Sequence, residues 1–358
     1  MSRLTARPLR RSLDQIRYVT PVRPAAARDL IASVYAQSER DFGMIAPPVA
    51  LHSPAPGPLA ACWIMLRETL LAPPAGGRAA RETVAAAVSL GNACPYCVAV
   101  HGAAMGGLAG GPEAAAIASG RVEAITSTQL REIAAWALNT GELAAPGGPP
   151  FPAAELPRLA GVALTFHYLN RMVNVFLEDS PLPPATPGVV GRGLMRVLAR
   201  IMLSAGRGAA PPGASVSLLP AAPLPADLAW AAGLPHVAGA LSRAAAAIED
   251  AAARAVPASV RELVLSQLAG WDATAPGPGR GWVADAVSGV PPADRPAATL
   301  ALLTALASYQ VLPADIDSFQ RHQPGDEALI AVTSWASLAA ARRAASWLVT
   351  DPPARATA

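Results

Sequence analysis

The sequence RETVAAAVSLGNACPYCVAVHG, residues 81–102, decides how the rest of the chain is interpreted. It holds two of the three cysteines of the protein, Cys94 and Cys97, in a Cys-x-x-Cys spacing. His101 follows the second cysteine by four residues, and Glu82 precedes the first by twelve. We take this segment as the candidate site and the remainder of the chain as the scaffold that supports it.

The segment predicts two helices joined by a tight turn. Residues 78–90 are mostly apolar or small and contain no helix breaker, so they are expected to form the first helix. Gly91 and Asn92 are expected to supply the left-handed residue that commonly ends a helix. Pro95 suits the first position of the second helix, because its fixed φ and missing N–H cost nothing there.

Both thiols should therefore lie at the start of the second helix, with Cys94 at or beside the N-cap and Cys97 in the first turn. The helix dipole and the unpaired N–H groups there favour a thiolate, so Cys97 is expected to be the acidic, nucleophilic thiol. His101 lies one helical step beyond Cys97, on the same face. In an antiparallel hairpin, Glu82, about 13 Å from the turn, and His101, about 9 Å from it, come to similar depths. Together they form a candidate proton relay.

Two structural explanations of the cysteine pair stay open beside redox chemistry. Zinc usually takes ligands from two knuckles, and no second Cys or His pair is present. A structural disulfide across so short a loop gains little stability. Covalent haem attachment requires a histidine directly after the second cysteine, where this chain has Val98. Redox chemistry is favoured over zinc binding, a structural disulfide and haem attachment.

The pattern Glu82-x11-Cys94-x2-Cys97-x3-His101 resembles the core motif of the alkylhydroperoxidase D and carboxymuconolactone decarboxylase superfamily. The resemblance implies an all-helical fold, a peroxide-reducing dithiol, and neither a metal nor an organic cofactor. It also implies that Cys97 is the peroxidatic cysteine, Cys94 the resolving cysteine, and Glu82 with His101 the proton relay. Family members often have a histidine between the cysteines, where this chain has Tyr96.

The function implied is a thiol-dependent alkyl hydroperoxide reductase, an antioxidant oxidoreductase of the peroxidase type. Its partners would be a hydroperoxide and a dithiol or lipoyl-type reductant protein. The first alternative is a lactone decarboxylase of the same superfamily, although such members generally lack the cysteine pair. The second is a protein without enzymatic activity, whose disulfide switches its interactions.

Composition supports an all-α protein. Of 358 residues, 52% are hydrophobic and 15% are charged, which is enough apolar material for a large core. The 37 prolines and 29 glycines are expected to separate Ala-rich helices. Further helices are predicted over residues 26–40, 59–71, 112–119, 128–139, 155–177 and 189–204.

Charge and hydropathy exclude several partners. The net charge of +3 comes from dispersed arginines without a basic stripe, so nucleic acid is not an expected partner. The basic start MSRLTARPLRRS is followed by no apolar signal segment, and no run of 18 apolar residues occurs. We expect a cytoplasmic protein without membrane association, in which a Cys-x-x-Cys pair is more often catalytic than structural. The sequence does not decide between a monomer and a homo-oligomer.

Four regions are predicted: an arm over 1–25, the domain with the cysteines over 26–180, a Pro/Gly-rich linker with a short helix over 181–225, and a second helical domain over 226–350. The second domain is expected to be a degenerate copy of the first. Recurring landmarks lead to this prediction: Arg81-Glu82 and Arg261-Glu262, and Glu155 with Arg171 against Glu327 with Arg343. Thr274 and Gly277 stand where the copy would need its cysteines, so its chemistry is lost.

Other chemistry-bearing residues receive structural interpretations. Cys62 lies in an apolar helix and is expected to be a small core residue. His52, His236 and His322 are expected to be surface or capping residues. The polar run HYLNRMVN, residues 167–174, either lines the approach to the thiols or forms a hydrogen-bonded network in the core, and the sequence does not choose between the two.

Overall fold

The computed structural model describes residues 12–72, 77–138, 148–182, 186, 188–206 and 210–349. Within these ranges the regular structure is helical and no strand occurs, which confirms the predicted all-α class. The α-helices are Asp29–Asp41 (α2), Pro47–Ala50 (α3), Pro56–Leu66 (α4), Arg78–Gly91 (α5), Pro95–Ala109 (α6), Gly111–Ala118 (α7), Thr128–Leu138 (α8), Leu156–Phe176 (α9), Gly188–Gly206 (α10), Pro235–Ala255 (α11), Ala258–Gly270 (α12), Gly281–Val287 (α13), Arg295–Ala307 (α14), Pro313–His322 (α15) and Asp326–Val349 (α16).

Short helical turns connect these helices. Those of the 3-10 type are Ser12–Gln15 (η1), Pro24–Ala26 (η2), Val122–Ala124 (η4), Ala153–Glu155 (η5), Val216–Leu218 (η6), Ala226–Gly233 (η7) and Ser308–Gln310 (η8). The turn Arg67–Leu71 (η3) is π-helical and continues α4, so the buried helix predicted over 59–71 is present with this change of pitch. Proline stands in the first turn of α3, α4, α6, α9, α11, α14 and α15, which is where proline-rich connections are expected to start helices.

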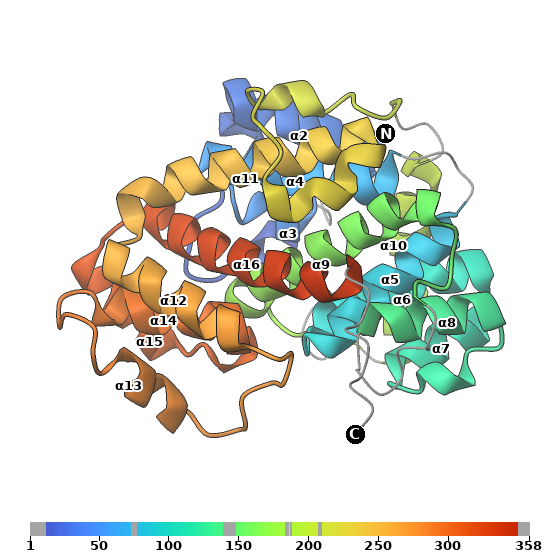
Figure 1. The fold of residues 1–358 in the computed structure, drawn as a ribbon. Coiled ribbons are helices and arrows are strands. Elements are labelled where there is room, and N and C mark those ends of the chain that lie inside the picture. The colour runs from blue at the N-terminus through green and yellow to red at the C-terminus, as the bar shows by residue number, and fades with distance from the viewer. Residues whose placement is uncertain are drawn as a thin grey trace, which may run out of the picture.

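Two helix pairs form the centre of the molecule. The helices α9 and α16 pack against each other, and α4 packs against α11. In Figure 1, α5 to α8 lie on one side of this centre and α12 to α15 on the other. Each pair joins a helix of the predicted first domain to a helix of the predicted second. The boundaries of the two domains and their common origin remain predictions.

The region predicted as a linker is held by buried charges. Glu68 accepts hydrogen bonds from the backbone N–H of Gly213 at 2.7 Å and from Ser215 Oγ at 2.6 Å. Arg67 donates to the carbonyl of Pro211 at 3.0 Å. Both charged side chains are fully buried, so this return of the chain is fixed to the core.

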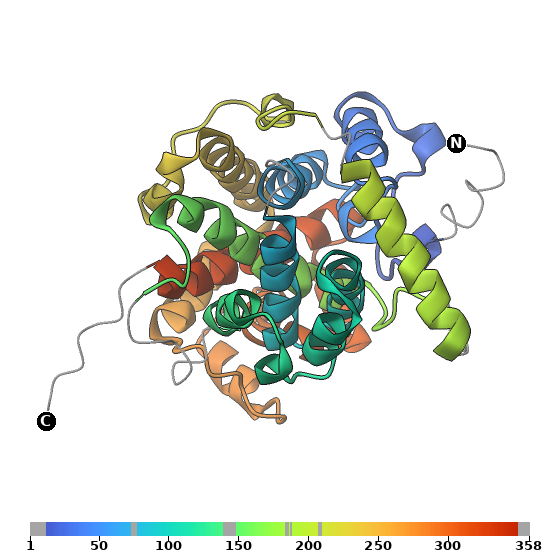
Figure 2. The same ribbon diagram turned by 90° about the vertical axis from the view of Figure 1, so that its right-hand side faces the viewer.

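The helix α10 lies outside this centre, against α2 and α6, as Figure 2 shows from the side. A Cβ added at Gly107 of α6 would stand 2.9 Å from Leu203 Cδ1 of α10, so glycine lets the Leu203 side chain pack closely against α6. The short helix predicted over 189–204 is thus α10, and its inner face reaches the candidate site.

The beginning of the chain runs along the helical core. Of the arm predicted over 1–25, residues 1–11 lie outside the described residues. In the remainder, Leu13 and Val19 are buried, and the backbone N–H of Arg17 donates to the carbonyl of Phe176 at 2.8 Å. Among the described helices, none is both long and apolar enough to cross a membrane.

Candidate active site

The two helices of the predicted hairpin are present, and the turn between them differs from the prediction. The helix α5 continues through Gly91, and Asn92 has φ of −88°. Ala93 is the left-handed residue, with φ of 48°. The expectation that Gly91 or Asn92 is the left-handed residue was wrong. The last turn of α5 extends over Gly91, so the change of chain direction falls at Ala93. The backbone N–H of Cys94 then closes the turn on the carbonyl of Ser89 at 2.9 Å.

Both thiols lie where the hairpin predicts them. Cys94 is the N-cap of α6, and Cys97 lies in its first turn. Both are unoxidised and buried, with 1% and 3% of their surface exposed. The side chains of Cys94 and of Asn170 on α9 lie close enough to the Cys97 thiol to shift its pKa. The structure therefore presents a reduced pair of neighbouring thiols.

The prediction that Cys97 is an acidic thiol is wrong for this reduced form. Burial raises the pKa of Cys97 well above its usual value, and the neighbouring Cys94 thiol raises it further. The Asn170 side chain lowers the pKa of Cys97, but this effect is smaller. Because desolvation outweighs the helix terminus, Cys97 needs a base to become a thiolate.

Glu82 and His101 come together as the hairpin geometry predicts. The distance from Glu82 Oε2 to His101 Nδ1 is 2.7 Å. Arg78, one helical turn before Glu82, donates from Nε to Glu82 Oε1 at 2.8 Å. Burial alone raises the pKa of Glu82, but the charges and hydrogen bonds of Arg78 and His101 outweigh it and hold the pKa at about 2. The carboxylate is thus ionised in a fully buried position.

This carboxylate fixes the orientation of the imidazole. An ionised carboxylate can only accept hydrogen bonds, so His101 Nδ1 carries a proton and Nε2 is the ring nitrogen left for other partners. Phe166 of α9 packs edge-on against the His101 ring, with centroids 4.5 Å apart. The ring is therefore held both by charge and by packing.

Cys97 and His101 share the wall of a small cavity. Its volume is about 50 Å³. The other lining side chains are mostly apolar and come from α4, α6, α9, α10 and the segment before α4: Phe42, Met44, Ala46, Pro47, Pro48, Leu66, Tyr96, Val100, Phe166, Leu169, Leu198 and Met202. Leu198 and Met202 belong to α10, which thus closes one side of the cavity. Cys94 is not among the lining residues, so Cys97 is the thiol that faces it.

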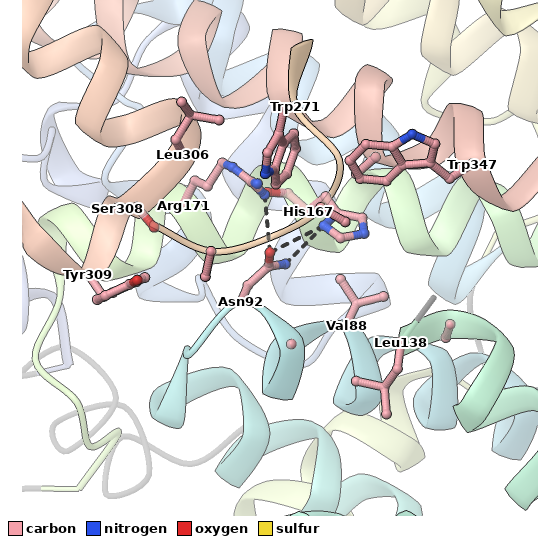
Figure 3. A pocket seen from close by; sticks show the side chains of 15 residues that line it. Val88, Asn92, Leu138, His167, Arg171, Trp271, Leu306, Ser308, Tyr309 and Trp347 are labelled. Atoms are coloured by element: carbon pink, nitrogen blue, oxygen red, sulfur yellow. Dashed lines mark hydrogen bonds between the residues drawn. The ribbon is translucent and has the colours of Figure 1, made fainter. Parts of the chain in front are cut away.

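The polar run of α9 forms a hydrogen-bonded network in the core, the second of the two roles that the sequence left open; of its residues, Leu169 is the one that lines the cavity of Cys97. Asn170 donates from Nδ2 to Ser89 Oγ at 3.0 Å and accepts a hydrogen bond from Asn92 Nδ2 at 3.0 Å. Asn92 also contacts His167 Nδ1 at 3.1 Å and accepts from Arg171 Nη1 at 3.3 Å, as the dashed lines in Figure 3 show. A continuous polar network therefore leads from Asn170, beside the thiol, to a second pocket on the far side of α9.

Sequence reasoning did not assign Arg78 or Asn92 to the site, and it placed Asn170 in the polar run of 167–174 without pairing it with Asn92. The spacing of four residues between Arg78 and Glu82 is the usual helical ion-pair spacing, and it could have indicated the first of them. Asn92 and Asn170 lie 78 positions apart and meet only because α5 packs on α9, which no local pattern reveals.

The remaining singled-out residues lie apart from this site. Cys62 is fully buried in α4, which confirms it as a core residue. His322 is exposed, as expected. His52 is not a surface residue: it is fully buried, contacts the Tyr168 hydroxyl at 2.8 Å, and burial lowers its pKa to about 4. It lies in the irregular segment before α4, which folds inward between helices.

The fold and the site together define an all-helical protein with a buried dithiol and a hydrogen-bonded Glu–His pair. No group of three or more His, Cys, Asp or Glu side chains suited to a metal ion occurs among the described residues. Comparison with curated proteins places the chain more narrowly. It is 34% identical over 341 residues to an alkyl hydroperoxide reductase of Mycobacterium tuberculosis, and the match covers 93% of this chain and 95% of that one.

The chain therefore belongs to the alkylhydroperoxidase D-like family. Neither a family model nor a solved structure matches it.

Proposed function

We propose that this protein is a thiol-dependent alkyl hydroperoxide reductase in which Cys97 attacks the peroxide. One observation carries the proposal: Cys97 and His101 line the same apolar cavity, while the neighbouring thiol of Cys94 does not line it. The name of the mycobacterial relative, which describes reduction of alkyl hydroperoxides, supports the same chemistry.

In the first step, the Cys97 thiolate attacks the terminal oxygen of the hydroperoxide. A sulfur–oxygen bond forms and the O–O bond breaks, so Cys97 becomes a sulfenic acid and the alcohol leaves with one proton. In the second step, Cys94 attacks the Cys97 sulfur. A disulfide forms, the sulfur–oxygen bond breaks, and the hydroxyl leaves as water after protonation.

The Glu82–His101 pair supplies the proton transfers that this sequence needs. His101 Nε2 accepts the Cys97 proton and then delivers it to the departing alkoxide. Glu82 stabilises the imidazolium that exists between these two transfers, because its charge lies 2.7 Å from Nδ1. A raised pKa of Cys97 makes this base necessary, since the thiol does not ionise readily by itself.

A dithiol restores the enzyme. A dithiol or lipoyl-type reductant protein attacks the Cys94–Cys97 disulfide, forms a mixed disulfide and leaves oxidised, so its two electrons and two protons regenerate both thiols. The net reaction converts a hydroperoxide and a dithiol into an alcohol, water and a disulfide. The cysteines and the proton relay suffice for it, without a metal or an organic cofactor.

The test is consumption of tert-butyl hydroperoxide by the purified protein with dihydrolipoamide as reductant. We expect turnover in the wild type and in Cys62→Ala, and a loss of about 100-fold or more in Cys97→Ser and in Cys94→Ser. Turnover that survives in Cys97→Ser contradicts the proposal. Decarboxylation of a lactone that persists in both cysteine variants would instead support the decarboxylase alternative.

A further inference from the structure

A second pocket lies on the opposite side of α9 from the cysteines, where the first and second halves of the chain meet. Its volume is about 100 Å³, several times the ~10–15 Å³ that one water needs. Its polar residues include Asn92, His167 and Arg171, and its aromatic residues are Trp271, Tyr309 and Trp347.

Arg171 is the charged group of this pocket. Only 4% of its surface is exposed, and burial lowers its pKa to about 10, so it is a cation at neutral pH. Its Nε donates to the carbonyl of Ala305 at 2.8 Å, and Nη1 donates to the carbonyl of His167 at 2.7 Å. No carboxylate of the described residues pairs with it, and its Nη2 has no partner among them. A buried cation without a counter-charge is costly unless a ligand supplies one.

His167 offers a second donor beside this cation. Burial and the charge of Arg171 lower the pKa of His167 well below its usual value, so the ring is neutral. His167 Nδ1 lies 3.1 Å from Asn92 Nδ2 and 3.3 Å from Asn92 Oδ1. In the tautomer that accepts at Nδ1 from the nearer Nδ2, the ring proton is on Nε2 and can be donated to a ligand. In Figure 3 the Arg171 and His167 side chains converge on Asn92.

The other side of the pocket is aromatic. The Trp271 and Trp347 rings meet at an angle of 64°, with centroids 4.9 Å apart, and the Arg171 guanidinium lies 5.7 Å from the Trp271 ring centroid. Both tryptophans are partly exposed, and they come from the loop after α12 and from α16. A pocket with mainly apolar walls and a few convergent polar groups is the usual form of a small-molecule site.

We propose that this pocket binds a small organic monocarboxylate, whose carboxylate meets Arg171 Nη2 and His167 Nε2 and whose flat apolar body packs on Trp271 and Trp347. The single positive charge matches one negative charge, which favours a monocarboxylate over a phosphate dianion. This site is distinct from the peroxide cavity, and its occupancy does not depend on the proposed reductase activity.

The test is calorimetric titration of the full chain with benzoate, benzamide and inorganic phosphate. Benzoate is expected to bind with a dissociation constant on the order of 1 mM or tighter. Benzamide has the same shape without the charge and is expected to bind at least ~10-fold more weakly, as is phosphate. Arg171→Gln should weaken benzoate by ~10-fold or more, and Trp347→Leu by roughly 3- to 10-fold.

The matched control is Arg254→Gln, which removes an equal charge from an exposed position on α11 and should leave benzoate binding unchanged. If Arg171→Gln fails to fold, the benzoate–benzamide pair and Trp347→Leu still decide the question. Equal binding of benzoate and benzamide overturns the proposal. So does tighter binding of phosphate, or Trp347→Leu binding benzoate as well as the wild type does.

Discussion

The helices α5 and α12 contain the same Arg-Glu pair, but the glutamates differ in burial and in their partners. In α5, Glu82 is fully buried between Arg78 and His101. In α12, Glu262 is exposed to solvent. Both helices therefore contain the Arg-Glu pair, but only the glutamate of α5 belongs to the candidate site.

The turns that follow these helices share a feature that the sequence did not predict. Ala93, twelve residues after Arg81, has φ of 48°, and Ala273, twelve residues after Arg261, has φ of 76°. Left-handed alanine is unfavourable, so its recurrence at the same offset is unusual. It supports our proposal that the two halves descend from one duplicated unit.

The comparison shows what makes the glutamate functional. After Ala93, α6 begins at once and returns along α5, which brings His101 over Glu82. After Ala273, the chain continues without helix to α13, which begins at Gly281. Because no helix returns along α12, only Val260, Val264 and Leu268 of this helix are buried, and Glu262 is exposed to solvent. The returning helix, more than the Arg-Glu pair, creates the site.

Exchanging each glutamate for glutamine should give the largest difference between the halves. Glu82→Gln removes the charge that supports the His101 imidazolium, so peroxide turnover should fall by roughly 10²- to 10⁴-fold. It also leaves buried Arg78 without its counter-charge, which should cost about 3 kcal/mol of unfolding free energy. Glu262→Gln should change the unfolding free energy by less than about 0.5 kcal/mol. Urea denaturation and the peroxide assay measure both; equal effects of the two changes would remove the basis of the comparison.

Acid should destabilise the first half through Glu82. Its folded pKa of about 2 lies below the ordinary 4.5, so its stabilisation is complete above pH 4.5 and is lost as the pH falls towards 2. The expected loss of unfolding free energy is about 3 kcal/mol.

His52 gives an earlier loss of unfolding free energy, between pH 6.5 and 4. Its pKa is lowered from 6.5 to about 4, so protonation favours the unfolded chain. Denaturation midpoints across this range measure both stages. Glu82→Gln should lack the later stage and keep the earlier one; a later stage that persists in this variant contradicts the assignment.

Asn170 should affect the reactivity of Cys97 more than a neighbouring asparagine does. Asn170→Ala removes an amide whose interaction with Cys97 lowers the pKa of the thiol, so alkylation of Cys97 by iodoacetamide should slow by roughly 3- to 10-fold, the size expected for one interaction of about 0.5–1.5 kcal/mol. The change also removes the hydrogen bonds of Asn170 to Ser89 and Asn92. Asn174→Ala is the control, because Asn174 bonds to the Asn92 carbonyl and to Ser308 instead of the thiol. Mass spectrometry of Cys97 gives both rates, and equal rates in the two variants would show that Asn170 has no special role.

Glycine at the two left-handed alanines should give the smallest effect. Ala93→Gly and Ala273→Gly each relieve about 1–2 kcal/mol of backbone strain and lose about 0.5–1 kcal/mol to chain entropy, so each should stabilise the fold by roughly 0.5–1 kcal/mol. Urea denaturation is the measurement. Destabilisation by both changes would mean that these turns are not strained. The two left-handed alanines would then no longer support a common origin of the two halves.

The local features of the site could be predicted from sequence because they follow from short-range rules. Pro95 marks the start of α6, the spacing of Cys97 and His101 puts both on one helical face, and the hairpin brings Glu82 to the same depth. Burial could not be predicted in this way. It reverses the expected acidity of Cys97, and it depends on α9 and α10 covering the hairpin.

The second pocket could not be predicted at all. Arg171 and Trp347 lie 176 positions apart and meet only because α9 packs on α16. The sequence predicted a helix over 155–177 and a second helical domain over 226–350, but apolar helices can pair in many ways. Which pairs form depends on the packing of the whole chain.

Mapping of disulfides after one equivalent of tert-butyl hydroperoxide, without any reductant, tests the central claim most directly. The account predicts that peptide mass spectrometry finds a Cys94–Cys97 disulfide in nearly every molecule while Cys62 stays a free thiol, because Cys62 is fully buried away from the cavity. Cys94 and Cys97 remaining reduced under excess peroxide, or Cys62 being oxidised first, would contradict it.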